Sequence, residues 1–205
     1  MTVSVIIPAY NRATRIEATV RSVRRYADEV VVIDDGSVDS TAEMAAWARA
    51  RVVRQPVHSG TVAALKRGFR EAQGDVVVTM GTDGDYCAED IPRLVRPILD
   101  DQADLVLGCR PHIACLSERF LNWLTSLRVK VSDPGTGFRA LRRDLAIRLQ
   151  FPGTYIYGIW VLEAAALGAR IAEVPIQLEH AEQPRQIASF DVVKAWHLLP
   201  WLIRK

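Results

Sequence analysis

Five short apolar runs, separated by segments with helical spacing, limit what this chain can fold into more than any other feature. The runs lie at residues 3–7, 30–33, 52–53, 76–80 and 105–108. The segments between them place apolar residues every three or four positions, as amphipathic helices do. Strands that are apolar throughout and alternate with helices are typical of a parallel sheet covered by helices on both faces. We therefore expect an α/β fold, and the length of 205 residues favours one domain over two small ones.

Composition and charge exclude several classes of protein. Hydrophobic residues make up 49% of the chain, which is enough for a substantial core. The net charge of +2 gives no electrostatic footprint for nucleic acid, so we expect no nucleic-acid partner. The three cysteines form no C-x-x-C pair, which argues against a disulfide framework or a thiolate zinc site and favours a reducing, cytoplasmic location. Neither a signal peptide nor an apolar run of about 18 residues is apparent, so any membrane contact is expected at the surface.

The second half of the chain is less regular than the first. Residues 117–131 form an amphipathic stretch that is rich in aromatic and basic side chains. The Gly/Pro turn that begins at Asp133 is expected to lead into a helix. Further on we expect a buried helix within 155–168, a strand within 169–180 and an amphipathic segment at 192–205.

Polar residues follow four of the predicted strands, at positions 8–11, 34–37, 80–85 and 109–110. Ligands of open α/β sheets bind outside the carboxyl ends of the strands. The topology therefore predicts a functional site at this edge of the sheet before any motif is considered.

Two carboxylates, Asp83 and Asp85, stand at the end of the fourth predicted strand with Gly84 between them. In extended chain, residues two apart point to the same face, so both carboxylates can converge on one cation. Two carboxylates with open water positions suit Mg²⁺ or Mn²⁺, especially when a substrate diphosphate supplies further oxygens. The alternative is a solvated acidic turn, because turns favour these residue types.

Asp34 and Asp35 follow the second predicted strand, where their carboxylates can accept hydrogen bonds from a nucleobase or a ribose. Gly60 opens a predicted helix, and helix N-termini favour anions. A turn with a helix cap explains the same aspartates. No P-loop is present and no G-x-G-x-x-G follows the first strand, so ATPases and dinucleotide oxidoreductases lose support.

Six stretches occur in a characteristic order between residues 3 and 178: VSVIIPAYNR, VVVIDDGSVDST, GDVVVTMGTDGDYCAEDIPRLV, ADLVLGCR, DPGTGFRALRRD and ARIAEVPI. Together they resemble glycosyltransferase family 2, and most closely the polyprenyl-phosphate sugar transferases of the dolichol-phosphate mannosyltransferase type. The resemblance implies a GT-A fold with a Rossmann-like, mostly parallel sheet. It also implies a UDP- or GDP-sugar donor, transfer with inversion, and a divalent metal. Residues 1–110 would form the nucleotide-sugar-binding half and residues 111–205 the acceptor-binding half.

The resemblance also assigns roles to individual positions. Asp83 matches the last acid of the family's D-x-D motif, the metal ligand, and Asp85 can join it. Arg110 matches an arginine that faces the diphosphate or the acceptor phosphate. Asp133 matches a residue near the reaction centre, with Arg139 on the acceptor side. The donor-binding positions are Pro8, Ala9, Tyr10, Asp34, Asp35, Gly60 and Asp83.

The sequence departs from the family pattern at the metal motif. Gly81 stands where the first acid of D-x-D is expected, so the motif reads G-T-D. Asp85 can compensate for the missing acid. Alternatively, the metal is held more weakly, the donor sugar is unusual, or the protein binds a nucleotide sugar without transferring it. Arg12 also replaces the usual Glu after Tyr-Asn.

The acceptor decides whether the enzyme needs a general base. A phosphate monoester has a second pKa of about 6 and is largely ionised at pH 7, whereas deprotonating a hydroxyl costs about 12 kcal/mol with water as a proxy. A lipid phosphate needs positive charge and an apolar surface, which Arg119 and its aromatic neighbours would supply. A soluble hydroxyl acceptor would need a base, for which Asp133 is the candidate.

The C-terminal segment 192–205 has basic residues and tryptophans that suit a membrane surface. The alternative is that it packs on the domain or on a second copy of the chain in a homodimer.

Overall fold

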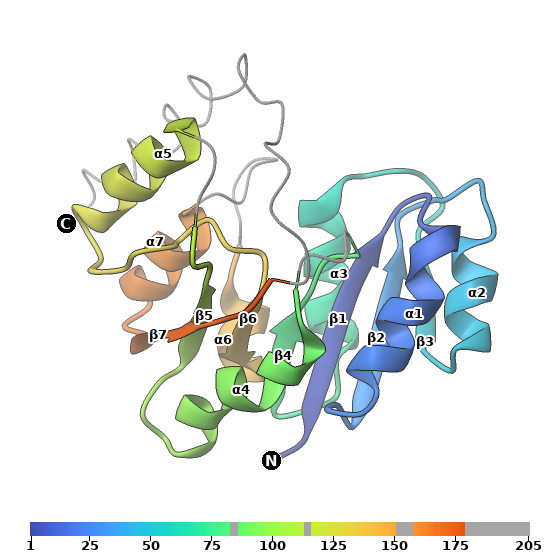
Figure 1. The fold of residues 1–205 in the computed structure, drawn as a ribbon, viewed down its shortest axis with the longest axis horizontal. Coiled ribbons are helices and arrows are strands. Elements are labelled where there is room, and N and C mark those ends of the chain that lie inside the picture. Colours follow the sequence, from blue (N-terminus) through green and yellow to red (C-terminus); the bar gives the residue numbers. More distant parts are fainter. Residues whose placement is uncertain (83–85, 113–115, 151–157, 179–205) are drawn as a thin grey trace.

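The computed structural model describes residues 1–82, 86–112, 116–150 and 158–178. Asp83, Asp85 and the segment 192–205 lie outside these residues, so the predictions made for them remain predictions. In Figure 1 the described elements form one α/β unit.

A seven-stranded sheet forms the centre of the molecule, in the order β3-β2-β1-β4-β6-β5-β7. The register pairs β1 in parallel with β2 and β4, and β5 in parallel with β7, while β6 runs antiparallel between β4 and β5. The sheet is therefore mostly parallel, as the sequence predicts. The strands are β1 (Val3–Ala9), β2 (Glu29–Asp34), β3 (Arg51–Arg54), β4 (Val76–Thr79), β5 (Leu105–Cys109), β6 (Arg139–Arg142) and β7 (Ile171–Pro175).

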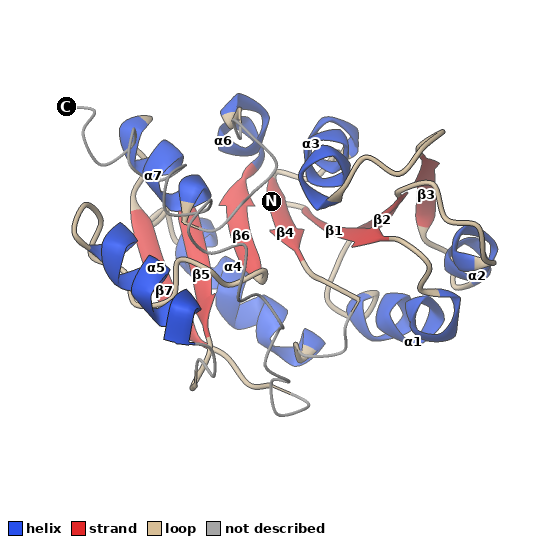
Figure 2. Cartoon of the chain, turned by 90° about the horizontal axis from the view of Figure 1, so that it is seen from above, coloured by secondary structure: helices blue, strands red, loops and turns tan. Residues whose placement is uncertain are grey.

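Helices cover both faces of this sheet (Figure 2). Apolar side chains of α1, α2 and α4 pack on one face, and those of α3, α6 and α7 pack on the other. Along β1 the residues alternate between these two cores, with Val5 and Ile7 in the first and Ile6 in the second. The helices are α1 (Ala13–Val23), α2 (Thr41–Trp47), α3 (Thr61–Glu71), α4 (Ile91–Leu99), α5 (Leu116–Ser126), α6 (Arg143–Arg148) and α7 (Ile159–Ala166), with a 3₁₀ turn, η1 (Ala88–Asp90), before α4.

One sequence expectation, a helix directly after the turn at Asp133, is wrong. The structure places β6 there, and only then the short helix α6. Arginine, alanine and leucine all favour helices, so local propensity points to a helix. Hydrogen bonding to β4 on one side and β5 on the other, with Ala140 and Leu141 buried on opposite faces, outweighs that propensity.

The strand directions bring the predicted strand ends together at one edge of the sheet. Because β6 is antiparallel to both of its neighbours, β5 runs in the same direction as β1, β2 and β4. The carboxyl ends of these four strands therefore meet at one edge of the sheet, near Ala9, Asp34, Thr79 and Cys109.

Candidate active site

The two aspartates at the end of β2 are buried and form bonds within the protein. Asp34 accepts a hydrogen bond from the main-chain N–H of Ser37 at 3.1 Å and forms an ion pair with Arg54 at 3.0 Å. Asp35 lies under the N-terminus of α3, where the N–H groups of Ser59 and Gly60 donate to it at 2.9 and 2.7 Å. The turn expected from the sequence is present at Asp34. Asp35 holds the two residues that precede α3 and does not cap a helix.

The Asp35 carboxylate also accepts from two side chains of the loop after β3. The Gln55 amide nitrogen lies 2.5 Å from Oδ1, and Nδ1 of His58 lies 2.8 Å from Oδ2. The His58 ring stacks on the ring of Tyr10, with centroids 3.9 Å apart and planes at 25°. The sequence alone assigns no role to His58 and does not predict this contact, which joins residues 48 positions apart in the chain.

The remaining predicted donor positions line the same edge. Ala9 is buried and Pro8 half-buried at the end of β1, while Tyr10 is exposed. Gly60 has a φ of +88°, a conformation that side chains other than glycine rarely adopt, and this lets its N–H point at Asp35.

The predicted metal ligands Asp83 and Asp85 are not described, so the fit of a cation is judged from what surrounds them. Gly81 leads into this motif, and a Cβ built on it would meet nothing within 4 Å. The site thus has room for the acid that the family pattern places there. Among the described residues no other cluster of three or more His, Cys, Asp or Glu side chains forms a metal site. The assignment of Asp83 and Asp85 as ligands of Mg²⁺ or Mn²⁺ stays a prediction, made from the preference of these ions for carboxylate oxygens.

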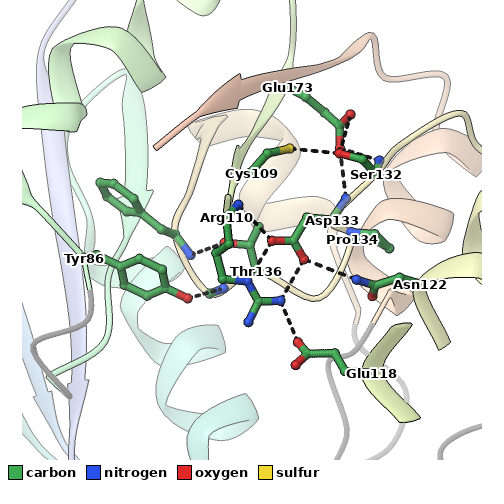
Figure 3. A network of polar contacts seen from close by, with 12 residues as sticks. Tyr86, Cys109, Arg110, Glu118, Asn122, Ser132, Asp133, Pro134, Thr136 and Glu173 are labelled. Atoms are coloured by element: carbon green, nitrogen blue, oxygen red, sulfur yellow. Dashed lines mark hydrogen bonds and ion pairs between the residues drawn. The ribbon is translucent and has the colours of Figure 1, made fainter. Parts of the chain in front are cut away.

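Arg110 and Asp133 form the centre of a buried polar network at the end of β5 (Figure 3). The Asp133 Oδ2 atom accepts from the main-chain N–H of Arg110 at 3.2 Å and from its Nε at 2.7 Å. Oδ1 accepts from Nη2 of Arg110 at 2.7 Å and from the Asn122 amide at 3.3 Å. A carboxylate has about four acceptor positions, so these four bonds fill the capacity of Asp133.

A second carboxylate, that of Glu118, pairs with the same guanidinium at 2.6 Å. Glu118 and Asn122 stand four residues apart on α5, so both reach the network from one face of that helix. Gly135 permits this approach, because a Cβ there would lie 2.9 Å from Oε1 of Glu118. The sequence alone assigns no role to Glu118 or Asn122. Their i, i+4 spacing was the signal that could have found them.

Glu173 on β7 fixes the loop that carries Asp133. Its Oε1 accepts from the main-chain N–H groups of Ser132 and Asp133 at 2.7 and 3.1 Å. The Ser132 hydroxyl in turn lies 3.3 Å from the Cys109 sulfur. The pKa of the Cys109 thiol is raised to about 12, mainly by burial; the hydrogen bond with Ser132 opposes this rise, and the nearby Glu173 adds to it.

The charges of the network are unequal. Burial lowers the pKa of Arg110, but its bonds and attraction to Asp133 and Glu118 outweigh burial and raise the pKa overall. One cation faces two carboxylates, so the formal charge of these three side chains is −1. Arg110 therefore brings no surplus positive charge to the site by itself.

The two arginines predicted on the acceptor side differ in position. Arg119 is exposed on α5. Arg139 is buried, donates to the Pro134 carbonyl at 2.8 Å and lies over the Trp160 ring at 4.4 Å. Burial lowers the pKa of Arg139 to about 10. Arg139 thus supports the turn after Asp133 through its hydrogen bond to the Pro134 carbonyl.

Fold and site together define an α/β protein with an open, mostly parallel sheet and a candidate site at the carboxyl ends of its strands. A profile of Glycosyl transferase family 2 matches residues 4–151, and the chain belongs to this family. Its fold is accordingly GT-A.

Curated relatives and solved structures agree with this assignment. The chain is 34% identical over 215 residues to the undecaprenyl-phosphate mannosyltransferase of Micrococcus luteus, covering 89% of this chain and 85% of the relative. It is 31% identical to the dolichol-phosphate mannosyltransferase of Pyrococcus furiosus, covering 71% of this chain and 47% of that one. Glucosyl-3-phosphoglycerate synthase from Mycobacterium tuberculosis, in complex with Mn²⁺, UDP and phosphoglyceric acid, superposes with a TM-score of 0.83 at 27% identity, covering 100% and 79% of the two chains.

The helices in the described part of the chain are all too short or too polar to cross a bilayer.

Proposed function

We propose that this protein transfers a sugar, with inversion, from a UDP- or GDP-sugar to a polyprenyl phosphate, with Mg²⁺ or Mn²⁺ as cofactor. Two relatives that carry such names support the acceptor class. A structural neighbour bound to UDP and Mn²⁺ supports the donor class and the metal.

The choice of a phosphate acceptor rests on Asp133, whose carboxylate already accepts four hydrogen bonds. All its acceptor positions are used by Arg110 and Asn122, so it is poorly placed to take a proton from a hydroxyl. A phosphate acceptor is already ionised near neutral pH and needs no base. We therefore assign Asp133 to holding Arg110 in place, and Arg110 to donating hydrogen bonds to a phosphate group at the reaction centre.

The Arg110 network is formally negative. The positive charge that the donor diphosphate and the acceptor phosphate need must therefore come from other groups. A divalent cation held by Asp83 and Asp85 would neutralise the charge that develops on the leaving diphosphate. The donor nucleoside would lie along Pro8, Ala9 and Tyr10, with Asp34, Asp35 and Gly60 at its edge.

The outer face of α5 suits an acceptor with an apolar tail. Phe120 and Trp123 on α5, and Leu127 directly after it, are each more than half exposed, and the rings of Phe120 and Trp123 lie 5.8 Å apart. The exposed side chains of Arg119 and Arg128 flank them. Basic residues around an apolar surface favour the boundary between headgroups and acyl chains, and the inner face of the same helix holds Glu118 and Asn122. The apolar surface therefore lies across α5 from the proposed reaction centre, about one helix diameter away.

A soluble acceptor is the second candidate, and Glu118 is the observation that favours it. In the described part of the chain Glu118 accepts one hydrogen bond from Arg110, so its carboxylate retains capacity for a proton. It could act as general base for a hydroxyl. The structural neighbour, by its name a glucosyl-3-phosphoglycerate synthase, is consistent with this version.

A transfer assay with radiolabelled nucleotide sugars separates the candidates. The purified chain is mixed with Mn²⁺ and either undecaprenyl phosphate in vesicles or 3-phosphoglycerate in solution. We expect label in the organic phase with the lipid and none on phosphoglycerate. Label on phosphoglycerate alone would replace the lipid acceptor by a soluble one. Binding of a nucleotide sugar without transfer to either would indicate a non-catalytic protein.

A further inference from the structure

His58 makes two contacts that a donor nucleobase would also need. Its ring stacks on Tyr10 with centroids 3.9 Å apart, and its Nδ1 lies 2.8 Å from Oδ2 of Asp35. Tyr10 and Asp35 are both assigned to the donor nucleoside in the proposed function, on which this inference rests. The imidazole stacks on an aromatic ring and directs an in-plane N–H at a carboxylate. A bound nucleobase can make the same two contacts.

The Asp35 carboxylate has no acceptor position left for a base while His58 is in place. Oδ1 accepts from the Gln55 amide and the Ser59 N–H. Oδ2 accepts from the Gly60 N–H and from Nδ1 of His58. The two main-chain donors belong to the start of α3 and are fixed by the fold. A base can therefore reach Asp35 only by replacing a side-chain donor. The side chain of His58 is 52% exposed and can move into solvent without unpacking the core.

We propose that His58 occupies the nucleobase position in the free protein, and that the donor base displaces it. The base takes over the face of Tyr10 and the Oδ2 atom of Asp35. This selects a base with a ring N–H, such as uracil or guanine. Cytosine turns the lone pair of its ring N3 toward the carboxylate and is disfavoured.

Two other arrangements satisfy the geometry less well. A base on the outer face of His58 would leave Asp35 saturated and would gain no contact with its carboxylate. A base inserted between the rings of Tyr10 and His58 would move the imidazole away by a ring thickness and break its contact with Asp35. Displacement uses both existing contacts and leaves no buried acceptor without a donor.

Calorimetric titration with UDP, GDP and CDP tests the proposal on three proteins. We expect His58→Ala to bind UDP or GDP about tenfold more tightly than the unchanged chain, because it removes the competing ring. Gln55→Ala is the matched control. It takes a donor from the other oxygen of Asp35 but keeps the ring stack, and its affinity should stay within about twofold. Equal or weaker binding by His58→Ala, or the same gain in both variants, would overturn displacement.

A second measurement follows the unchanged chain and uses the His58→Ala variant only to assign one resonance. The Hε1 resonance of His58, assigned by its absence from His58→Ala spectra, should lie upfield in the free protein because of the Tyr10 ring current. Addition of UDP or GDP should move it downfield as the ring leaves. A further upfield shift would show that the base stacks on His58 and would overturn the proposal. If the unchanged chain binds no nucleotide at all, the proposed function fails with it. If it binds and His58 stays in place, only the displacement is wrong.

Discussion

The carboxylate of Asp133 holds Arg110 at three points, its main-chain N–H, Nε and Nη2, at 3.2, 2.7 and 2.7 Å. Both side chains are almost completely buried. Breaking this pair by changing one partner leaves a buried charge with too few acceptors, which is more costly than the loss of an exposed pair.

Asp133→Asn should therefore lower both stability and turnover. Glu118 still pairs with Arg110, so we expect a loss of about 2 kcal/mol rather than the larger cost of leaving the cation alone. Donor affinity should change little, because Asp133 does not lie at the nucleoside. Chemical denaturation and steady-state kinetics measure the two effects. At equal fraction folded, a loss of turnover below about 10²-fold would support a positioning role for Asp133, and a larger loss would indicate a base.

Arg110→Lys tests the geometry of the guanidinium. Lysine keeps the charge but loses the planar fork that meets Asp133 and Glu118 together. Turnover should fall more than the affinity for the nucleotide sugar, which calorimetry follows separately. A variant with normal turnover would remove Arg110 from the reaction centre.

Glu118→Gln distinguishes the two acceptor classes. Glutamine can keep the contact from Arg110 through its carbonyl oxygen, and it removes one negative charge from the network. With a phosphate acceptor we expect unchanged kcat and a lower KM for the acceptor, because repulsion falls. With a hydroxyl acceptor and Glu118 as base, kcat should fall about 10²- to 10⁴-fold. A large loss of kcat on undecaprenyl phosphate would contradict the assignment.

Gly81→Asp tests the departure from the family's metal motif. The open space at Gly81 accommodates the new side chain, and the backbone there does not require glycine. If the missing acid only weakens metal binding, the variant should reach half-maximal activity at a lower Mn²⁺ concentration. If Gly81 makes room for an unusual donor, activity at saturating Mn²⁺ should drop. The companion changes Asp83→Ala and Asp85→Ala should abolish and weaken metal-dependent transfer, respectively.

The outer face of α5, with the exposed side chains of Phe120 and Trp123, should bind anionic vesicles. Replacing Phe120 and Trp123 by serine removes two exposed aromatic side chains and should reduce vesicle binding and use of a long-chain acceptor, while UDP or GDP binding is retained. Trp47→Ser is the matched control, since Trp47 is a similarly exposed tryptophan on α2. Sedimentation with vesicles measures both variants. Equal losses in the two would remove the specific role of α5.

The sequence by itself determined the class of fold and the edge that carries the site. Apolar runs such as 30–33 and 76–80 are strands because strands buried on both faces must be apolar throughout, and this local rule needs no knowledge of the partners. The same rule placed Asp34, Asp35, Arg110 and the residues around Gly81 at the carboxyl ends of parallel strands. Motif order then supplied the family, which the profile match confirms.

Only the tertiary structure decided which side chains meet. In the structure Arg139–Arg142 is a strand, and Arg110 and Asn122 donate to the carboxylate of Asp133. The ring of His58 stacks on that of Tyr10. These contacts join positions far apart in the chain, and their geometry depends on how helices and loops pack. Periodicity describes only the face that one element presents. The partner across that face, and hence the number of acceptors left on a carboxylate, follows from the packing of the whole chain.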